Sequence, residues 1–165
     1  MDETNAKERL KALIADLRAY GLRLIDGLSL DEFIWKPKSS KGRSIQSIFR
    51  HVVNTELFWL NTLNLIEQEP EYSPRESNLK ELKERYIELQ ELLTNLLDNA
   101  GPNDLIANVD PESRTLAWAV WRTSLHSVHH LAQISYLRFA LNKPPDAASV
   151  DTSWGKVIDL IIANM

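Results

Sequence analysis

Apolar residues recur at steps of three and four along most of this chain, separated by charged and polar residues. These steps match the roughly 3.6-residue turn of an α-helix and collect the apolar side chains on one face. The pattern predicts four long helices, over residues 5–26, 44–66, 78–99 and 113–141. No segment alternates apolar and polar residues between hairpin turns, so the sequence predicts no β-sheet.

Capping residues mark several ends of the predicted helices. Ser44 has the short polar side chain of an N-cap, and Asn78 with Glu81 resembles a capping box. A glycine and a proline at positions 101 and 102 end the third long helix, and prolines at 144 and 145 end the fourth. The expected fold is therefore all-α, a four-helix bundle that forms one domain over residues 1–165.

Shorter elements flank this bundle. Residues 28–35 predict a single helical turn, which is followed by a lysine-rich loop over residues 36–42. We interpret this loop as solvated, and an anion-binding site is the less favoured alternative. Asp151 is placed to cap a short additional C-terminal helix, whose apolar positions are Trp154, Val157, Ile158, Ile161 and Ile162.

The composition narrows the possible functions. The net charge is −4 and no Lys/Arg cluster offsets it, so the sequence gives no electrostatic case for a nucleic-acid partner. The absence of cysteine excludes a disulfide framework, a thiolate zinc site and a cysteine nucleophile. No apolar run approaches the roughly 18 residues of a membrane helix, and the charged N-terminus lacks the apolar core of a signal peptide. We therefore expect a cytoplasmic protein that has no membrane partner.

Three of the four histidines lie in the predicted helix over residues 113–141. Since successive helical residues are about 100° apart, His126 and His130 are separated by only about 40° and lie one turn apart. Steps of three and four through this pair define a line that is apolar at its ends and polar in its middle: Leu116, Ala119, Thr123, His126, His130, Gln133, Leu137 and Ala140. Burial of polar groups is costly unless they are paired or bound to a ligand, so this polar stretch requires a partner.

His51 lies on a comparable line of the helix over residues 44–66, formed by Ser44, Ile48, His51, Thr55, Phe58, Thr62 and Leu65. Two facing lines that carry three imidazoles predict a metal site at His51, His126 and His130. Imidazole ligands suit Zn²⁺, Ni²⁺, Cu²⁺ or Fe²⁺, and three of them leave at least one coordination position open. The alternative is a set of hydrogen-bonded core histidines that hold no metal, which is the usual role of a lone buried histidine.

Two further residues are accessory candidates. His129 is rotated by about 80° from the histidine line, so we do not expect it to share the metal. It is either an acid–base group at the rim of a pocket or, as we favour, a half-buried residue on the flank of the helix. Gln133 lies one turn beyond His130 and is placed to orient that histidine or to contact a substrate, with simple polar packing as the alternative.

One class of metalloenzyme is excluded by the residues around the histidines. The helix reads HSVHH rather than HExxH, so the glutamate base of the zinc proteases is missing. Glu56 is about 140° around its helix from His51, so we expect it to point elsewhere. A nucleophile activated at this site would depend on the metal alone to lower its pKa.

The segments SIQSIFRHVVNTELFWL and HSVHHLAQISYLRFALNKPP, with LSLDEFIWKP before them, resemble the DinB-like family of metal-dependent four-helix bundles, also described as YfiT-like. The resemblance extends over nearly the whole chain, and the two histidine segments make it specific. It implies that the metal ligands are His51, His126 and His130. The family often has Arg-Gly after the double histidine, whereas this chain has Leu131 and Ala132 and retains Gln133.

What the resemblance implies about activity is broad, because the family includes thiol-dependent transferases and isomerases as well as many members without a known activity. Our first hypothesis is an enzyme with a divalent metal, first of all zinc or nickel, that activates a low-molecular-weight thiol or water against a small electrophile. Its activity would be that of a thiol transferase or a hydrolase, in detoxification or stress response. The alternatives are a non-catalytic metal-binding or ligand-sensing bundle and a structural helical dimer. The resemblance also implies a homodimer.

Overall fold

The computed structural model describes residues 3–38, 42–66, 71–101, 103–107, 109 and 114–145. Within these residues the chain is all-helical, with no strand, which confirms the predicted fold class. Its helices are α1 (Glu3–Ile25), α2 (Leu30–Ile34), α3 (Ile45–Thr62), α4 (Leu79–Asn99) and α5 (Leu116–Ala140). The short C-terminal helix predicted after Asp151 lies outside the described residues.

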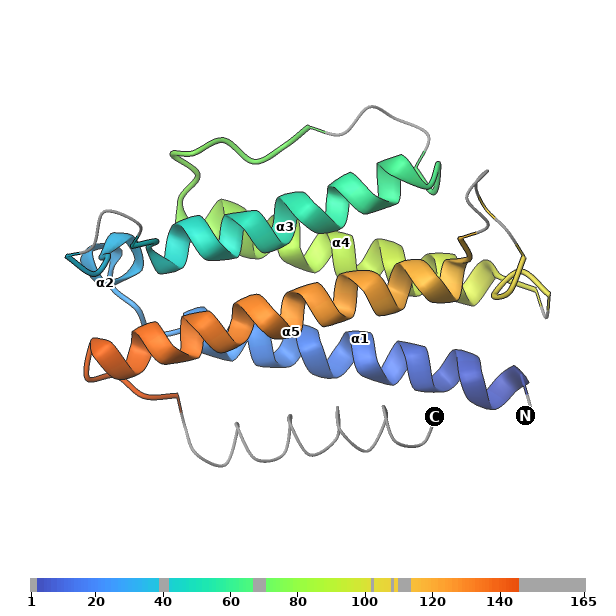
Figure 1. Cartoon of the computed structure of the whole chain (residues 1–165), viewed down its shortest axis with the longest axis horizontal. Coiled ribbons are helices and arrows are strands. Elements are labelled where there is room, and N and C mark those ends of the chain that lie inside the picture. Colours follow the sequence, from blue (N-terminus) through green and yellow to red (C-terminus); the bar gives the residue numbers. More distant parts are fainter. Residues whose placement is uncertain are drawn as a thin grey trace.

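The four long helices lie side by side as a bundle (Figure 1). Each long helix packs against two others: α1 and α3 each contact both α4 and α5. Figure 1 also shows that α3 and α4 run in one direction along the bundle and that α1 and α5 run in the other. This arrangement places α3 directly against α5, the two helices that carry the histidines. The core they enclose includes the fully buried rings of Phe33, Phe49 and Tyr86.

The predicted capping residues form the helix starts. Ser44 accepts a hydrogen bond from the backbone N–H of Ser47, at 3.1 Å, and Asn78 forms a capping box with Glu81. The predicted start of α5 at residue 113 is wrong, because the N-cap is Thr115, whose hydroxyl accepts from the N–H of Trp118 at 3.0 Å. A hydroxyl one residue before the apolar run satisfies an N–H that would otherwise lack a partner.

Two asparagines end the helices that carry the histidines. Asn64 and Asn142 have φ values of 53° and 59°, in the left-handed region. Beyond them, Leu65 N–H donates to the Leu60 carbonyl and Lys143 N–H donates to the Arg138 carbonyl, which is the pattern of a Schellman motif. The predicted end of α3 at residue 66 is therefore wrong, since the left-handed Asn64 stops the helix at Thr62.

The predicted polar lines lie at the edges of the buried helix faces, not at their centres. On α3, Phe58 is 47% exposed while Glu56, outside the predicted line, is 1% exposed. On α5, Ala140 is exposed and Gln133 half-buried. Five members of the predicted line of α5 are buried, and the buried stripe extends beside them to a second set of residues. The predicted members are Leu116, Ala119, Thr123, His130 and Leu137, and the second set is Val120, Ser124, Ser127, Leu131 and Ile134. The clustered histidines therefore lie towards the edge of the contact between α3 and α5, where His51 and His126 are half-buried and His130 is buried.

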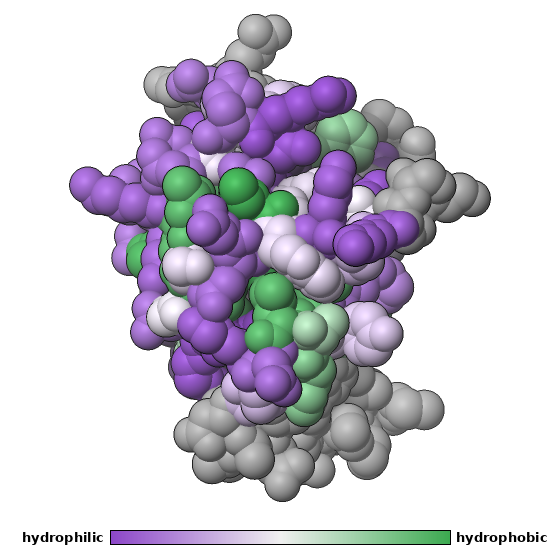
Figure 2. Space-filling model, turned by 90° about the vertical axis from the view of Figure 1, so that its left-hand side faces the viewer, coloured by the Kyte–Doolittle hydropathy of each residue, from purple (hydrophilic) through white to green (hydrophobic). Residues whose placement is uncertain are grey.

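On the end of the bundle that Figure 2 faces, hydrophilic side chains cover most of the coloured surface, and hydrophobic side chains occupy smaller areas. In the described part of the chain, no helix has an apolar stretch of the length needed to cross a bilayer.

Candidate metal centre

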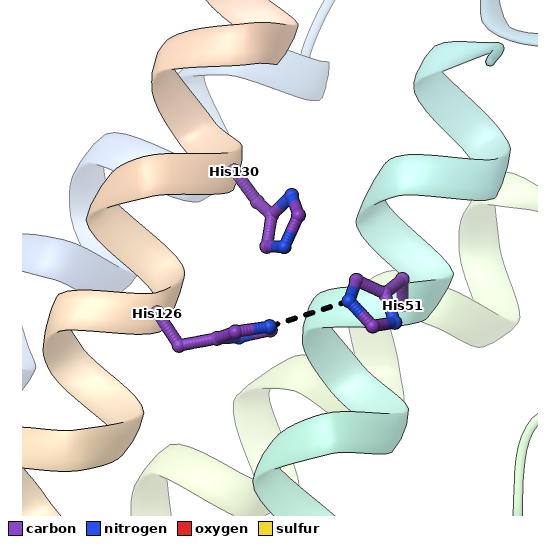
Figure 3. A group of neighbouring side chains, drawn as sticks. All are labelled: His51, His126 and His130. Atoms are coloured by element: carbon purple, nitrogen blue, oxygen red, sulfur yellow. Dashed lines mark hydrogen bonds between the residues drawn. The ribbon is translucent and has the colours of Figure 1, made fainter. Parts of the chain in front are cut away.

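The three predicted histidines meet at the contact of α3 with α5. His51 comes from the middle of α3, and His126 and His130 come from successive turns of α5. The centroids of the three rings are 4.5 to 5.0 Å apart. Figure 3 shows the imidazoles of His126 and His130 on one helix and that of His51 on the other, all directed toward one another. One potential ligand atom from each lies within 4.8 Å of the other two, so the backbone already gathers the three imidazoles at one point.

The spacing of the ring nitrogens fits a small divalent ion. The Nε2 atoms of His51 and His126 are 3.3 Å apart. Ligand nitrogens about 2.05 Å from a tetrahedral Zn²⁺ are separated by about 3.3 Å. Two imidazole nitrogens at this distance must either share a proton or direct their lone pairs at a common cation. The donor set of three imidazoles therefore fits a divalent transition-metal ion.

Burial keeps the three imidazoles neutral at physiological pH. The pKa of His126 is lowered from 6.5 to about 4, mainly by burial and in addition by the neighbouring His130 and His51. Burial is also the largest cause of the lowered pKa values of His51 and His130. Neutral imidazoles offer their lone pairs to a metal, whereas imidazolium ions cannot bind one. The environment thus favours the protonation state that a metal site requires.

Gln133 fixes the orientation of His130. Its Oε1 lies 2.9 Å from Nδ1 of His130, and because an amide oxygen only accepts, Nδ1 of His130 carries the proton. The Nε2 lone pair of His130 is then free to face the other two histidines. Nδ1 of His51 lies 3.4 Å from Oγ1 of Thr55, while Nδ1 of His126 is buried with no hydrogen-bond partner in the described part of the chain. Gln133 therefore has the position that an orienting residue of a metal ligand occupies.

His129 lies outside the group of three, on an exposed part of the same helix. Its Nε2 is 3.0 Å from the amide nitrogen of Gln133. Since an amide N–H donates, this nitrogen of His129 accepts, and the chain of hydrogen bonds runs from His130 through Gln133 to His129. Both accessory candidates are thus linked to one ligand of the cluster.

A pocket of about 620 Å³ adjoins the cluster. His129, His130 and Gln133 line it from α5, and Arg43 and Ile48 line it from the start of α3 and the residues before it. Its volume is within the range of roughly 300–1,000 Å³ that is typical of small-molecule sites. The arrangement therefore gives a small molecule access to one face of His130.

Sequence reasoning missed the role of Glu56. Its carboxyl group is buried among α3, α4 and α5, where Ser127 Oγ donates to it at 2.7 Å and Gln90 Nε2 donates at 2.8 Å. Burial raises its pKa from 4.5 to about 7, despite the opposing effect of these two hydrogen bonds. Glu56 points away from the histidines, as its position on the helix predicts. The burial of its side chain in the core was not predicted from the sequence. The signal was available, because Glu56 is four residues from both Val52 and Leu60 on the buried stripe of α3.

A family model described as the DinB superfamily matches residues 7–134 of this chain. The match runs from α1 into α5 and includes all three clustered histidines. No curated protein matches the chain, and no solved structure does.

Proposed function

The chain belongs to the DinB superfamily, and from this membership and its histidine cluster we propose that it is a metal-dependent enzyme. Its proposed ligands are His51, His126 and His130. The observation that carries the proposal is the convergence of three neutral imidazoles from α3 and α5, with two Nε2 atoms 3.3 Å apart. In the proposed reaction a small thiol or a water attacks a small electrophile, the bond from the electrophile to its leaving group breaks, and the thiol or water gives up a proton, as in a thiol transferase or a hydrolase.

A divalent ion bound there, with zinc or nickel as the first candidates, supplies Lewis-acid chemistry that lowers the pKa of a thiol or a water. The residues of the chain perform the other tasks. His51, His126 and His130 present lone pairs because burial keeps them neutral. Gln133 holds His130 in one tautomer, and the pocket of about 620 Å³ admits the substrate beside His130. His129, exposed at the rim, is placed to exchange protons with solvent.

Single substitutions test the ligand assignment. We expect His51→Ala, His126→Ala and His130→Ala each to abolish stoichiometric zinc uptake by an untagged protein, measured by elemental analysis and by calorimetric titration. His129→Ala is the matched control on the same helix, because it changes a histidine outside the cluster, and we expect it to retain one zinc per chain. Retention of zinc by His130→Ala together with its loss in His129→Ala would refute the assignment.

Turnover distinguishes the enzyme from a non-catalytic metal-binding or ligand-sensing bundle. The zinc- or nickel-loaded protein is assayed with several low-molecular-weight thiols and small electrophiles, and His126→Ala serves as the inactive control. The proposal requires turnover that depends on the metal and on His126. The homodimer remains a prediction, which the molar mass in solution tests.

A further inference from the structure

Among the residues that the structure describes, the lining of the pocket beside the histidine cluster contains one permanent cation and no acidic residue. That cation is Arg43, which lies just before the N-cap of α3 and is exposed. Arg43 forms no ion pair or hydrogen bond with any residue that the structure describes. Arg43 and His130 line the same pocket, so the guanidinium lies beside one of the three clustered histidines. The guanidinium therefore faces the site without a counter-ion from the described chain.

The sequence on either side of Arg43 does not supply that counter-ion. Residues 33–55 contain five basic residues and no acidic one, although the whole chain has a net charge of −4. The carboxylate of Glu32, which precedes this segment, is bound at 2.7 Å by Lys143 and also accepts from the N–H of Ser29. Glu56, which follows it, is buried in the core with Ser127 and Gln90. The nearest carboxylates in the sequence are thus both engaged elsewhere.

The rest of the lining is largely apolar. Two buried side chains, Ile48 in the first turn of α3 and Leu137 in the last turn of α5, line the pocket. Pro37 and Ala132 add further apolar surface to the lining. Tyr136 is 72% exposed and adds an aromatic ring to the wall. A ligand that matches this lining has an apolar body and one group of negative charge.

We propose that this pocket binds a small carboxylate, whose charged group pairs with Arg43 and whose apolar body lies against Ile48 and Leu137. The planar guanidinium presents two parallel N–H donors that fit a carboxylate. One guanidinium also matches the single charge of a carboxylate better than a phosphate monoester, which carries about −1.5 to −2 charges at neutral pH. The inference rests on the proposed function, since it makes the carboxylate the substrate class of the histidine site.

Calorimetric titration with hexanoate, hexanamide and hexyl phosphate tests the proposal on the metal-free protein at low salt. Hexanoate and hexanamide have the same apolar body and differ in charge. We expect hexanoate to bind at least tenfold more tightly than hexanamide, since one charge-assisted hydrogen bond accounts for about a tenfold to hundredfold change in Kd. Its binding should weaken as salt is added, because Arg43 is exposed to solvent.

The variant Arg43→Gln removes the charge, and we expect it to bind hexanoate no more tightly than hexanamide. Arg43→Lys keeps the charge without the planar fork and should bind with intermediate affinity. Arg75→Gln is the matched control, because it removes an exposed arginine that does not line the pocket, and it should bind as the wild type does. Equal binding of hexanoate and hexanamide, or unchanged binding by Arg43→Gln, overturns the proposal. Tighter, Arg43-dependent binding of hexyl phosphate overturns the assignment to a carboxylate.

A separate zinc titration keeps this inference distinct from the proposed function. Wild type and Arg43→Gln should both take up one zinc, since Arg43 is not a ligand. Failure of the wild type to bind zinc refutes the metal site, whereas normal zinc uptake without Arg43-dependent hexanoate binding refutes only the carboxylate pocket. Titration of the zinc-loaded protein completes the test, because hexanoate held by the metal alone would bind Arg43→Gln as tightly as wild type, and this result also overturns the proposal.

Discussion

Replacement of Glu56 by glutamine should change how the stability of the protein depends on pH. The carboxyl group is 1% exposed, and burial raises its pKa from 4.5 to about 7 in the folded state. Between these two values the folded protein holds a proton that the unfolded chain has released, so the free energy of unfolding falls as pH rises. A difference of about 2.5 pKa units corresponds to about 3 kcal/mol of stability, present below pH 4.5 and lost as pH rises through 7.

Glu56→Gln removes this contribution while it keeps the size of the side chain. At pH 8 the variant avoids a buried charge, so we expect it to be more stable than wild type by about 2 kcal/mol. At pH 5 wild-type Glu56 is protonated and carries no charge. We expect the variant to be less stable than the wild type by about 1 kcal/mol at this pH, because an amide at position 56 cannot reproduce all the hydrogen bonds that the carboxyl group forms with Ser127 and Gln90. The difference between the two proteins should therefore change by about 3 kcal/mol over this range.

Urea unfolding of the metal-free proteins at pH 5, 6, 7 and 8, followed by circular dichroism, measures this difference. The comparison must be between variants, because the lowered pKa values of His51, His126 and His130 make stability rise with pH over part of the same window. Both proteins contain these histidines, so their effect cancels. Glu91→Gln, a change at an exposed position of α4, should follow the wild-type profile. Parallel profiles for wild type and Glu56→Gln would show that Glu56 titrates normally and would refute the reasoning.

Two further predictions concern the metal and the core. Zinc at a thousandfold excess over its Kd should stabilise the protein by about 4 kcal/mol at pH 7.5. The affinity for zinc should fall mainly as pH drops from 6 towards 4, because burial lowers the pKa of His126 to about 4. Equal melting temperatures with and without zinc at pH 7.5 would contradict the metal site. Gly21→Ala should destabilise the protein by about 1–3 kcal/mol in urea unfolding, because the new Cβ would lie 2.8 Å from the Tyr86 hydroxyl oxygen. Helix propensity alone predicts that alanine adds about 1 kcal/mol of stability. A variant more stable than the wild type would therefore refute the clash with Tyr86.

The fold was accessible from sequence because helical periodicity is a local property. Steps of three and four located all four long helices, and the capping residues Ser44 and Asn78 were identified by their side chains. The helix ends were less predictable, because Asn64 stops α3 through a left-handed backbone conformation that asparagine adopts only in some contexts. The pocket was not predictable at all, since it depends on how the residues before α3 lie against α5.

The members of the histidine cluster were predictable from the sequence, but its place within the bundle was not. The i, i+4 spacing of His126 and His130 fixed their common direction, and the structure brings His51 to them from α3. Their line, however, follows the edge of the buried face, because Ser127 rather than His126 points into the core. Periodicity gives the relative angles of side chains on one helix, whereas the rotation of that helix about its axis depends on the packing of its neighbours.

This rotation divides the polar residues of α3 and α5 into two separate groups. The three histidines cluster at the contact of α3 with α5, and one of them, His130, lines a pocket in which a ligand can reach it. Glu56, Ser127 and Gln90 form a closed network in which the hydroxyl and amide donors are directed at the carboxylate oxygens. A buried polar group with its own hydrogen-bond partners needs no ligand, whereas three neutral imidazoles at a solvent-accessible edge, two of them 3.3 Å apart, retain lone pairs for a cation. The metal is therefore expected at the edge of the bundle, and the core carboxyl affects the site only through the stability of the fold.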